Sequence, residues 1–95
     1  MTVKAVPTVQ IDDDRVRVTE WRFAKGAATG FHRHEFDYVV LPRTTGKLKI
    51  VGPDGEESFA DLNDGQAYAR KAGVEHDVIN AHDGEFIFIE VEIKN

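Results

Sequence analysis

Short segments in which apolar and polar residues alternate run along most of the chain. Such a period of two residues is typical of β-strands, and no stretch of helix length shows a sustained apolar period of 3.6 residues. The pattern predicts eight or nine strands, of which eight can be placed. They are residues 6–11, 15–24, 36–41, 47–51, 57–62, 66–70, 75–81 and 85–94.

Turn-forming residues separate these segments. Residues 52–55 read Gly-Pro-Asp-Gly and residues 63–65 read Asn-Asp-Gly, which are strong turn signals. Many short strands at this spacing predict an all-β sandwich or barrel. Closing the strands into a barrel or a double-sheet jelly roll removes exposed sheet edges. The interior of such a barrel is either filled by side chains or holds one ligand.

The alternation also predicts which side chains face the core. In the last segment the even and odd positions differ: Ile87, Ile89, Val91 and Ile93 form one set, and Phe86, Phe88, Glu90 and Glu92 form the other. We expect the isoleucine set to face the core and the two glutamates to be solvated. In residues 15–24, Trp21 and Phe23 share one face while Glu20 and Arg22 share the other. We expect this charged pair at the surface, the alternative being that it faces the interior.

Composition limits the function classes. The 95 residues suit one domain spanning 1–95, and a chain this short gains from a homodimer contact because it buries a modest share of its surface. The net charge of −5 and the pI near 5.3 argue against nucleic-acid binding. No apolar run reaches the length of a membrane span, and no signal peptide is recognisable, so we expect a cytoplasmic protein. With no cysteine, disulfides and thiolate metal sites are excluded.

The histidines are the candidate metal ligands of this sequence. His32 and His34 are two residues apart in an extended segment, so their imidazoles lie on one face, about 6.5–7 Å apart along the strand. Two imidazoles on one face are the start of a site for a divalent metal, which a third histidine and a carboxylate would complete. This spacing alone is a weak motif.

A longer sequence pattern strengthens the prediction of a metal site. Gly65, Gly73, His76 and Asn80 stand at the spacing of the second cupin motif, with Lys71 in place of its proline. Three features match the first cupin motif. Gly26 is separated from His32 by five residues, His32 and His34 form the histidine pair, and Gly46 follows. The chain therefore resembles a minimal single-domain cupin, a double-stranded β-helix or jelly-roll barrel of antiparallel strands. The stretches HRHEFDYVV, GVEHDVIN and FIFIEVEIK resemble the small bacterial cupins associated with β-alanine degradation.

The resemblance implies the metal ligands. They are His32, His34 and His76. The glutamate of the family motif would fall on Val39, which cannot bind a metal. Another alignment makes Asp37 the fourth ligand, which needs a bulge or turn after the histidine pair, because simple alternation points it outward and Tyr38 inward. The alternatives are a shell of three histidines only, or Tyr38 as the polar group facing the pocket.

The remaining polar residues have separate interpretations. His82 is expected to be a solvated residue in a turn, and Asn80 to cap a turn or tie a strand end. Tyr68 and Arg70 share a face before the second motif. The arginine can anchor a substrate carboxylate through two hydrogen bonds, or be an ordinary exterior residue.

The sequence thus predicts one divalent metal ion, with Fe(II), Mn(II), Ni(II) and Zn(II) all admissible, and a small organic acid as ligand or substrate. Such a site supports oxygenase chemistry, isomerisation or hydration. The alternative is a non-catalytic module that binds a small molecule or a metal, and a third reading is a filled, purely structural barrel.

Overall fold

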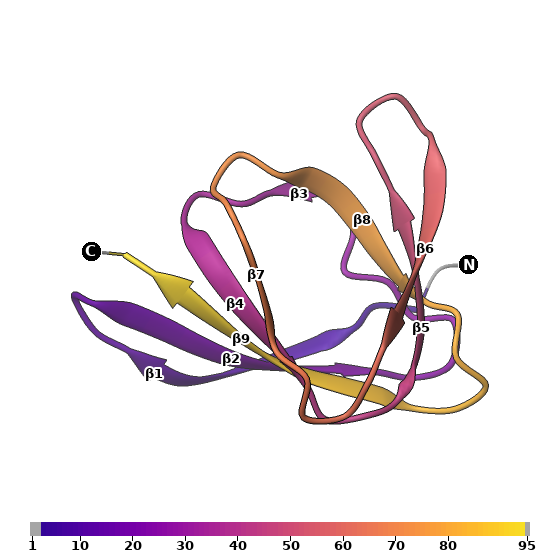
Figure 1. Cartoon of the computed structure of the whole chain (residues 1–95), viewed down its shortest axis with the longest axis horizontal. Coiled ribbons are helices and arrows are strands. Elements are labelled where there is room, and N and C mark those ends of the chain that lie inside the picture. Colours follow the sequence, from indigo (N-terminus) through magenta and orange to yellow (C-terminus); the bar gives the residue numbers. More distant parts are fainter. Residues whose placement is uncertain (1–2, 95) are drawn as a thin grey trace.

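Antiparallel pairing joins all the named strands in the described part of the chain. The computed structural model describes residues 3–94, which form nine strands and no helix (Figure 1). The predicted domain spans residues 1–95, of which residues 1, 2 and 95 lie outside the described part. The strands are β1 (Val6–Asp12), β2 (Val16–Phe23), β3 (His32–Arg33), β4 (Asp37–Pro42), β5 (Gly46–Val51), β6 (Glu57–Leu62), β7 (Tyr68–Arg70), β8 (Glu75–Asn80) and β9 (Phe86–Ile93).

Two sheets face each other. One has the strand order β1-β2-β9-β4-β7 and the other has the order β3-β8-β5-β6. Figure 1 shows β9 in the middle of the first sheet, between β2 and β4, with β5, β6 and β8 in the opposite wall. The predicted all-β barrel is confirmed, and the predicted strand ends differ from the observed ones by no more than two residues. The short strand β3 had not been placed as a separate element.

The inner face of the first sheet consists of rows of residues that are paired across the strands. Each row follows from the register of β2, β9, β4 and β7. The first row is Arg17, Glu92, Tyr38 and Arg70; the second is Thr19, Glu90, Val40 and Tyr68; the third is Trp21, Phe88 and Pro42; the fourth is Phe23 and Phe86. The barrel interior is therefore polar at one end and aromatic at the other.

This register corrects the predicted faces of the last strand. Phe86, Phe88 and Glu90 are buried, whereas Ile87 and Ile89 are only half-buried on the outer face of the sheet. The larger Phe rings fill the closed end of the barrel, where Phe23 and Phe88 pack with ring centroids 5.4 Å apart. Because side chains alternate strictly along a strand, burial of the two Phe residues carries the glutamates inward with them.

In β2 the charged pair lies where it was expected. Arg22 is exposed and Glu20 is half-buried on the outer face, and they form an ion pair of 3.4 Å. Trp21 packs against the core and Phe23 is fully buried. The surface interpretation of the charged pair is confirmed.

A buried asparagine closes the far end of the barrel. Asn80 is 2% exposed, and its side-chain amide donates to the carbonyls of Phe23, Ala24 and Gly84 at 3.3, 3.2 and 2.8 Å. Its Oδ1 accepts a hydrogen bond from the backbone of His82 at 2.8 Å. One side chain thus joins the end of β2 to the turn between β8 and β9, as the sequence predicted.

Replacing this asparagine tests its role. Asn80→Ala leaves buried carbonyl groups without partners, so we expect a loss of about 2–3 kcal/mol in the free energy of unfolding. For a domain of this size that is a fall in Tm of roughly 10 °C or more, measured by thermal unfolding. Asn63→Ala is the matched control, because Asn63 is exposed and its side chain bonds only to the Gln66 side chain. Equal effects of the two substitutions would contradict this account.

Candidate metal centre and barrel cavity

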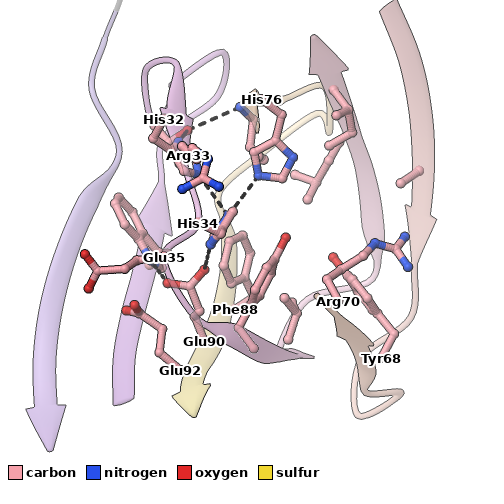
Figure 2. A pocket seen from close by; sticks show the side chains of 18 of the residues that line it. His32, Arg33, His34, Glu35, Tyr68, Arg70, His76, Phe88, Glu90 and Glu92 are labelled. Atoms are coloured by element: carbon pink, nitrogen blue, oxygen red, sulfur yellow. Dashed lines mark hydrogen bonds and ion pairs between the residues drawn. The ribbon is translucent and has the colours of Figure 1, made fainter. Parts of the chain in front are cut away.

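Backbone pairing brings together histidines that are far apart in the sequence. His32 on β3 is the register partner of His76 on β8. His34, just after β3, is held by two further bonds: its N–H donates to the Val74 carbonyl, and its carbonyl accepts from Gly73, each at 2.8 Å. The two predicted motifs therefore meet at one end of the barrel (Figure 2).

The three imidazoles converge through the same atom. Nε2 of His34 lies 3.0 Å from Nε2 of His32 and 3.0 Å from Nε2 of His76. These are the three side chains that could hold a metal ion among residues 3–94, with ligand atoms within 4.8 Å of one another. The ring pairs meet edge to face, with interplanar angles of 71 to 84°.

The hydrogen bonds behind the rings orient them. Nδ1 of His32 lies 2.8 Å from the Gly30 carbonyl, an acceptor, so this nitrogen carries the hydrogen and Nε2 presents a lone pair to the cluster. His34 stacks on the ring of Tyr38, with centroids 3.8 Å apart and planes 15° apart. On its other side, Nδ1 of His34 faces Oε2 of Glu90 at 3.8 Å, which is longer than a hydrogen bond.

Burial sets the protonation of the site. Burial, and after it the neighbouring histidines, lower the pKa of His34 and of His76 to about 4. Burial likewise raises the pKa of Glu90 to about 7, with Glu92 as the next cause, and raises the pKa of Tyr38 to about 12. The imidazoles of His34 and His76 are therefore neutral at pH 7, the form in which histidine binds a metal.

The donor set fits a metal ion. Three neutral imidazoles cannot satisfy both 3.0 Å contacts, because His32 offers only a lone pair and one hydrogen on the central Nε2 cannot align with two neighbours. A cation bound by all three nitrogens removes this conflict. Imidazole nitrogens bind zinc at about 2.0–2.1 Å, a length that suits nitrogens about 3 Å apart.

A cavity of about 720 Å³ adjoins the histidines. Charged residues of the first inner row line it. Arg17 is already paired with Glu92 through two hydrogen bonds of 2.9 and 2.7 Å. Arg70 instead lies over the ring of Tyr68 at 5.0 Å, and within residues 3–94 it forms no ion pair. Its guanidinium is thus available to an anionic ligand.

The structure brings most of the predicted site residues together. The three histidines, Tyr38, Tyr68 and Arg70 all line the cavity. Asp37 does not join them: it is exposed, and its Oδ1 accepts a 2.8 Å hydrogen bond from the backbone of Ala72. Because β4 alternates without a bulge, Asp37 points away from the interior. His82 lies outside the cluster in its predicted turn, but it is half-buried rather than solvated, and it packs edge to face on Phe86.

Several cavity residues were missed by the sequence reasoning. Glu90 is the carboxylate that the structure places beside the histidines, and Trp21 donates from Nε1 to its Oε1 at 3.3 Å. The signal that could have found it is the pair Phe86 and Phe88, because alternation puts Glu90 on the same face as these two large rings. If the face with the two Phe residues is placed inside the barrel, Glu90 and Glu92 also face the cavity.

Comparison with known proteins agrees with this geometry. No family model matches the chain. A curated relative from Pseudomonas aeruginosa, named "Beta-alanine degradation protein BauB", is 60% identical over 91 residues, which are 96% of this chain and 95% of that protein. A cupin domain from Bordetella pertussis Tohama I is 54% identical and superposes with a TM-score of 0.95, covering 100% of this chain and 98% of that one. The chain belongs to the cupin family.

The cupin fold extends to distant structures. An RmlC-like cupin with a double-stranded β-helix fold from Methanocaldococcus jannaschii has a TM-score of 0.77 at 13% identity, covering 95% of this chain and 80% of that one. At that identity the likeness shows the fold alone. No helix of the described residues is long and apolar enough to cross a membrane.

The stacked pair of rings predicts a difference between two substitutions in this cupin. Tyr38→Leu removes the ring that holds His34 in place, so we expect metal affinity to fall about tenfold or more. Tyr38→Phe keeps the ring and should stay within about threefold of the parent protein. Competition with a chromophoric chelator for Zn(II) measures both, and thermal unfolding checks that each variant is folded. Equal losses in the two variants would remove the stacking from the account.

Proposed function

We propose that this cupin binds one divalent transition metal through His32, His34 and His76 and acts there on a small organic acid. The observation that carries the proposal is the convergence of three Nε2 atoms at the wall of a cavity, with two of the contacts between them being 3.0 Å. The nitrogen donors and the absence of thiolates admit Fe(II), Mn(II), Ni(II) and Zn(II). When bound, the metal supplies Lewis-acid or redox chemistry at its open coordination positions.

The side chains on the opposite wall suit an acid. Arg70 has no ionic partner among residues 3–94 and offers two parallel N–H donors to a carboxylate. The ring of Tyr68 lies beneath the guanidinium of Arg70, and this contact holds the guanidinium in one orientation. Tyr38 is the register partner of Arg70 and stacks on His34, so the carboxylate would lie beside Tyr38, between Arg70 and the histidines. The name of the relative BauB makes β-alanine the first acid to assay.

The alternative is a binding module without turnover. One observation favours it: the carboxylate beside the histidines, Glu90, contacts His34 at 3.8 Å through Nδ1 and is not one of the converging ligands. A shell of three histidines retains open positions for a ligand in either case. Oxygenase or isomerase turnover that requires the metal favours the enzyme, whereas tight binding of an acid without turnover favours the module.

Removing one histidine tests the metal site. His76→Ala deletes one of three ligands, so we expect near-stoichiometric metal content to fall by about tenfold or more, together with the metal-dependent gain in Tm. Elemental analysis by mass spectrometry, on protein purified without a chelator or a histidine tag, measures the first. Thermal unfolding with and without added metal measures the second.

Two controls accompany this variant. His82→Ala removes a histidine outside the cluster and should leave metal content unchanged. Asp37→Asn should do the same, because the Asp37 carboxylate faces Ala72 rather than the imidazoles. Loss of metal in the Asp37 variant would restore that residue as a ligand. Unchanged metal content in His76→Ala would refute the proposed centre.

We also propose that the cupin is a homodimer that joins the outer faces of two five-stranded sheets. On β2, β4 and β9 alone, eight apolar side chains occupy that face and none of them is buried: Val16, Val18, Val39, Leu41, Ile87, Ile89, Val91 and Ile93. Five strands about 4.8 Å apart, with lengths of three to eight residues, cover roughly 500 Å². Two such faces together bury about 1,000 Å², the least expected of a biological interface.

A charge placed in the middle of this face tests the dimer. The parent protein should elute at twice its 10.7 kDa mass in light-scattering chromatography, and Ile89→Lys should elute as a monomer. Phe59→Lys is the control, because Phe59 is 60% exposed on the opposite sheet. A monomeric parent protein at tens of micromolar would overturn the dimer. The cytoplasmic location expected from the sequence stays a prediction.

A further inference from the structure

The cavity is much larger than a three-carbon acid. The cavity volume of about 720 Å³ is many times the roughly 30 Å³ that one water molecule takes in the liquid. Cavities of this size, within the usual range of about 300–1,000 Å³, bury ligands of drug size. An acid as small as β-alanine would leave most of this space unfilled.

The two ends of the cavity differ in chemistry. The first inner row of the sheet, with Arg70 and Tyr38, lies beside the histidines. Four residues further along β9, about 13 Å away, the row of Trp21 and Phe88 forms an apolar wall. On the opposite sheet this deeper part is lined by side chains from three strands: Leu48 and Ile50, Ala60, and Val78.

Water is a poor occupant of the apolar end. A buried water needs two to four polar partners, and this wall supplies few of them. The indole Nε1 of Trp21 is already bonded to Glu90, at 3.3 Å. Apolar ligand surface placed against Phe88 and Leu48 would gain about 25 cal/mol for each Å² removed from water. The cavity therefore favours a ligand with one polar end and one apolar end.

We infer that the ligand of this cupin is a monocarboxylic acid with an apolar tail of about the size of an aromatic ring. Its carboxylate lies between Arg70 and the histidines, and its tail extends to the wall formed by Trp21, Phe88 and Leu48. The carboxylate end rests on the proposed function. The tail rests on the shape and lining of the cavity alone.

A series of three acids that differ only at the third carbon tests this inference. Propanoate carries hydrogen there, β-alanine an ammonium group and 3-phenylpropanoate a phenyl ring. Full burial of an aromatic side chain contributes about 1.5–3 kcal/mol, so 3-phenylpropanoate should bind about 10- to 100-fold more tightly than either of the others. Titration calorimetry measures the three affinities. The emission of Trp21, the single tryptophan, gives a second reading from within the cavity.

Two variants separate the ends of the ligand. Ala60→Leu adds bulk to a cavity-lining position and should bring the affinities of 3-phenylpropanoate and propanoate to within about threefold. Arg70→Gln removes the charged guanidinium and should lower the affinities for all three acids by a similar factor, so that the ratios between these affinities stay the same. The series on the parent protein decides the question even where a variant fails to fold.

The outcomes also distinguish this inference from the proposed function. Affinities within twofold across the series, or tightest binding by β-alanine, would overturn the apolar tail, while metal content could still support the metal centre. A preference for 3-phenylpropanoate in protein that takes up no metal would support the tail and refute the metal centre.

Discussion

The pairing of residues 32–34 with residues 73–76 holds two distant parts of the chain at one end of the barrel. It is formed by backbone groups: the register of β3 on β8 and the two bonds between His34 and the segment at Gly73 and Val74. Imidazole convergence follows from this pairing, because each ring stands on a strand or strand end whose position the ladder fixes. A metal that binds the three nitrogens would in turn stabilise the pairing, since binding to the folded state alone adds to its stability.

The central ring of the cluster depends on the first sheet as well. His34 lies between the ring of Tyr38 on β4 and the carboxylate of Glu90 on β9, so its orientation is set by two neighbouring strands of the opposite wall. Glu90 is itself oriented by the indole of Trp21 on β2. The centre therefore spans both sheets, and movement of one sheet against the other would separate its ligands.

Motif spacing and strand alternation were enough to predict the barrel, the three histidines and the tie made by Asn80. They were not enough to decide which face of a strand is inside when both faces carry apolar residues. In β9 the isoleucines and the phenylalanines compete for the interior, and the closed end of the barrel takes the larger rings. Glu90 enters the cavity as a consequence. Asp37 failed as a predicted neighbour of the histidines for the related reason that the supposed bulge is absent from β4.

The presence of apolar residues on both faces of β9 also explains the two roles that we assign to the first sheet, as a wall of the cavity and as a dimer interface. Because each strand alternates, a sheet whose central strand is apolar on both sides has one face for the barrel and a second, unburied face for another surface. The inner face changes from the paired charges of Arg17 and Glu92 at one end to the aromatic wall at Phe88 at the other. This change in polarity matches a ligand with one polar end and one apolar end. The outer face has no such gradient around Ile89 and Val91 and lies away from the cavity. A change in assembly and a change in ligand affinity should therefore be separable by substitutions on opposite faces of β9.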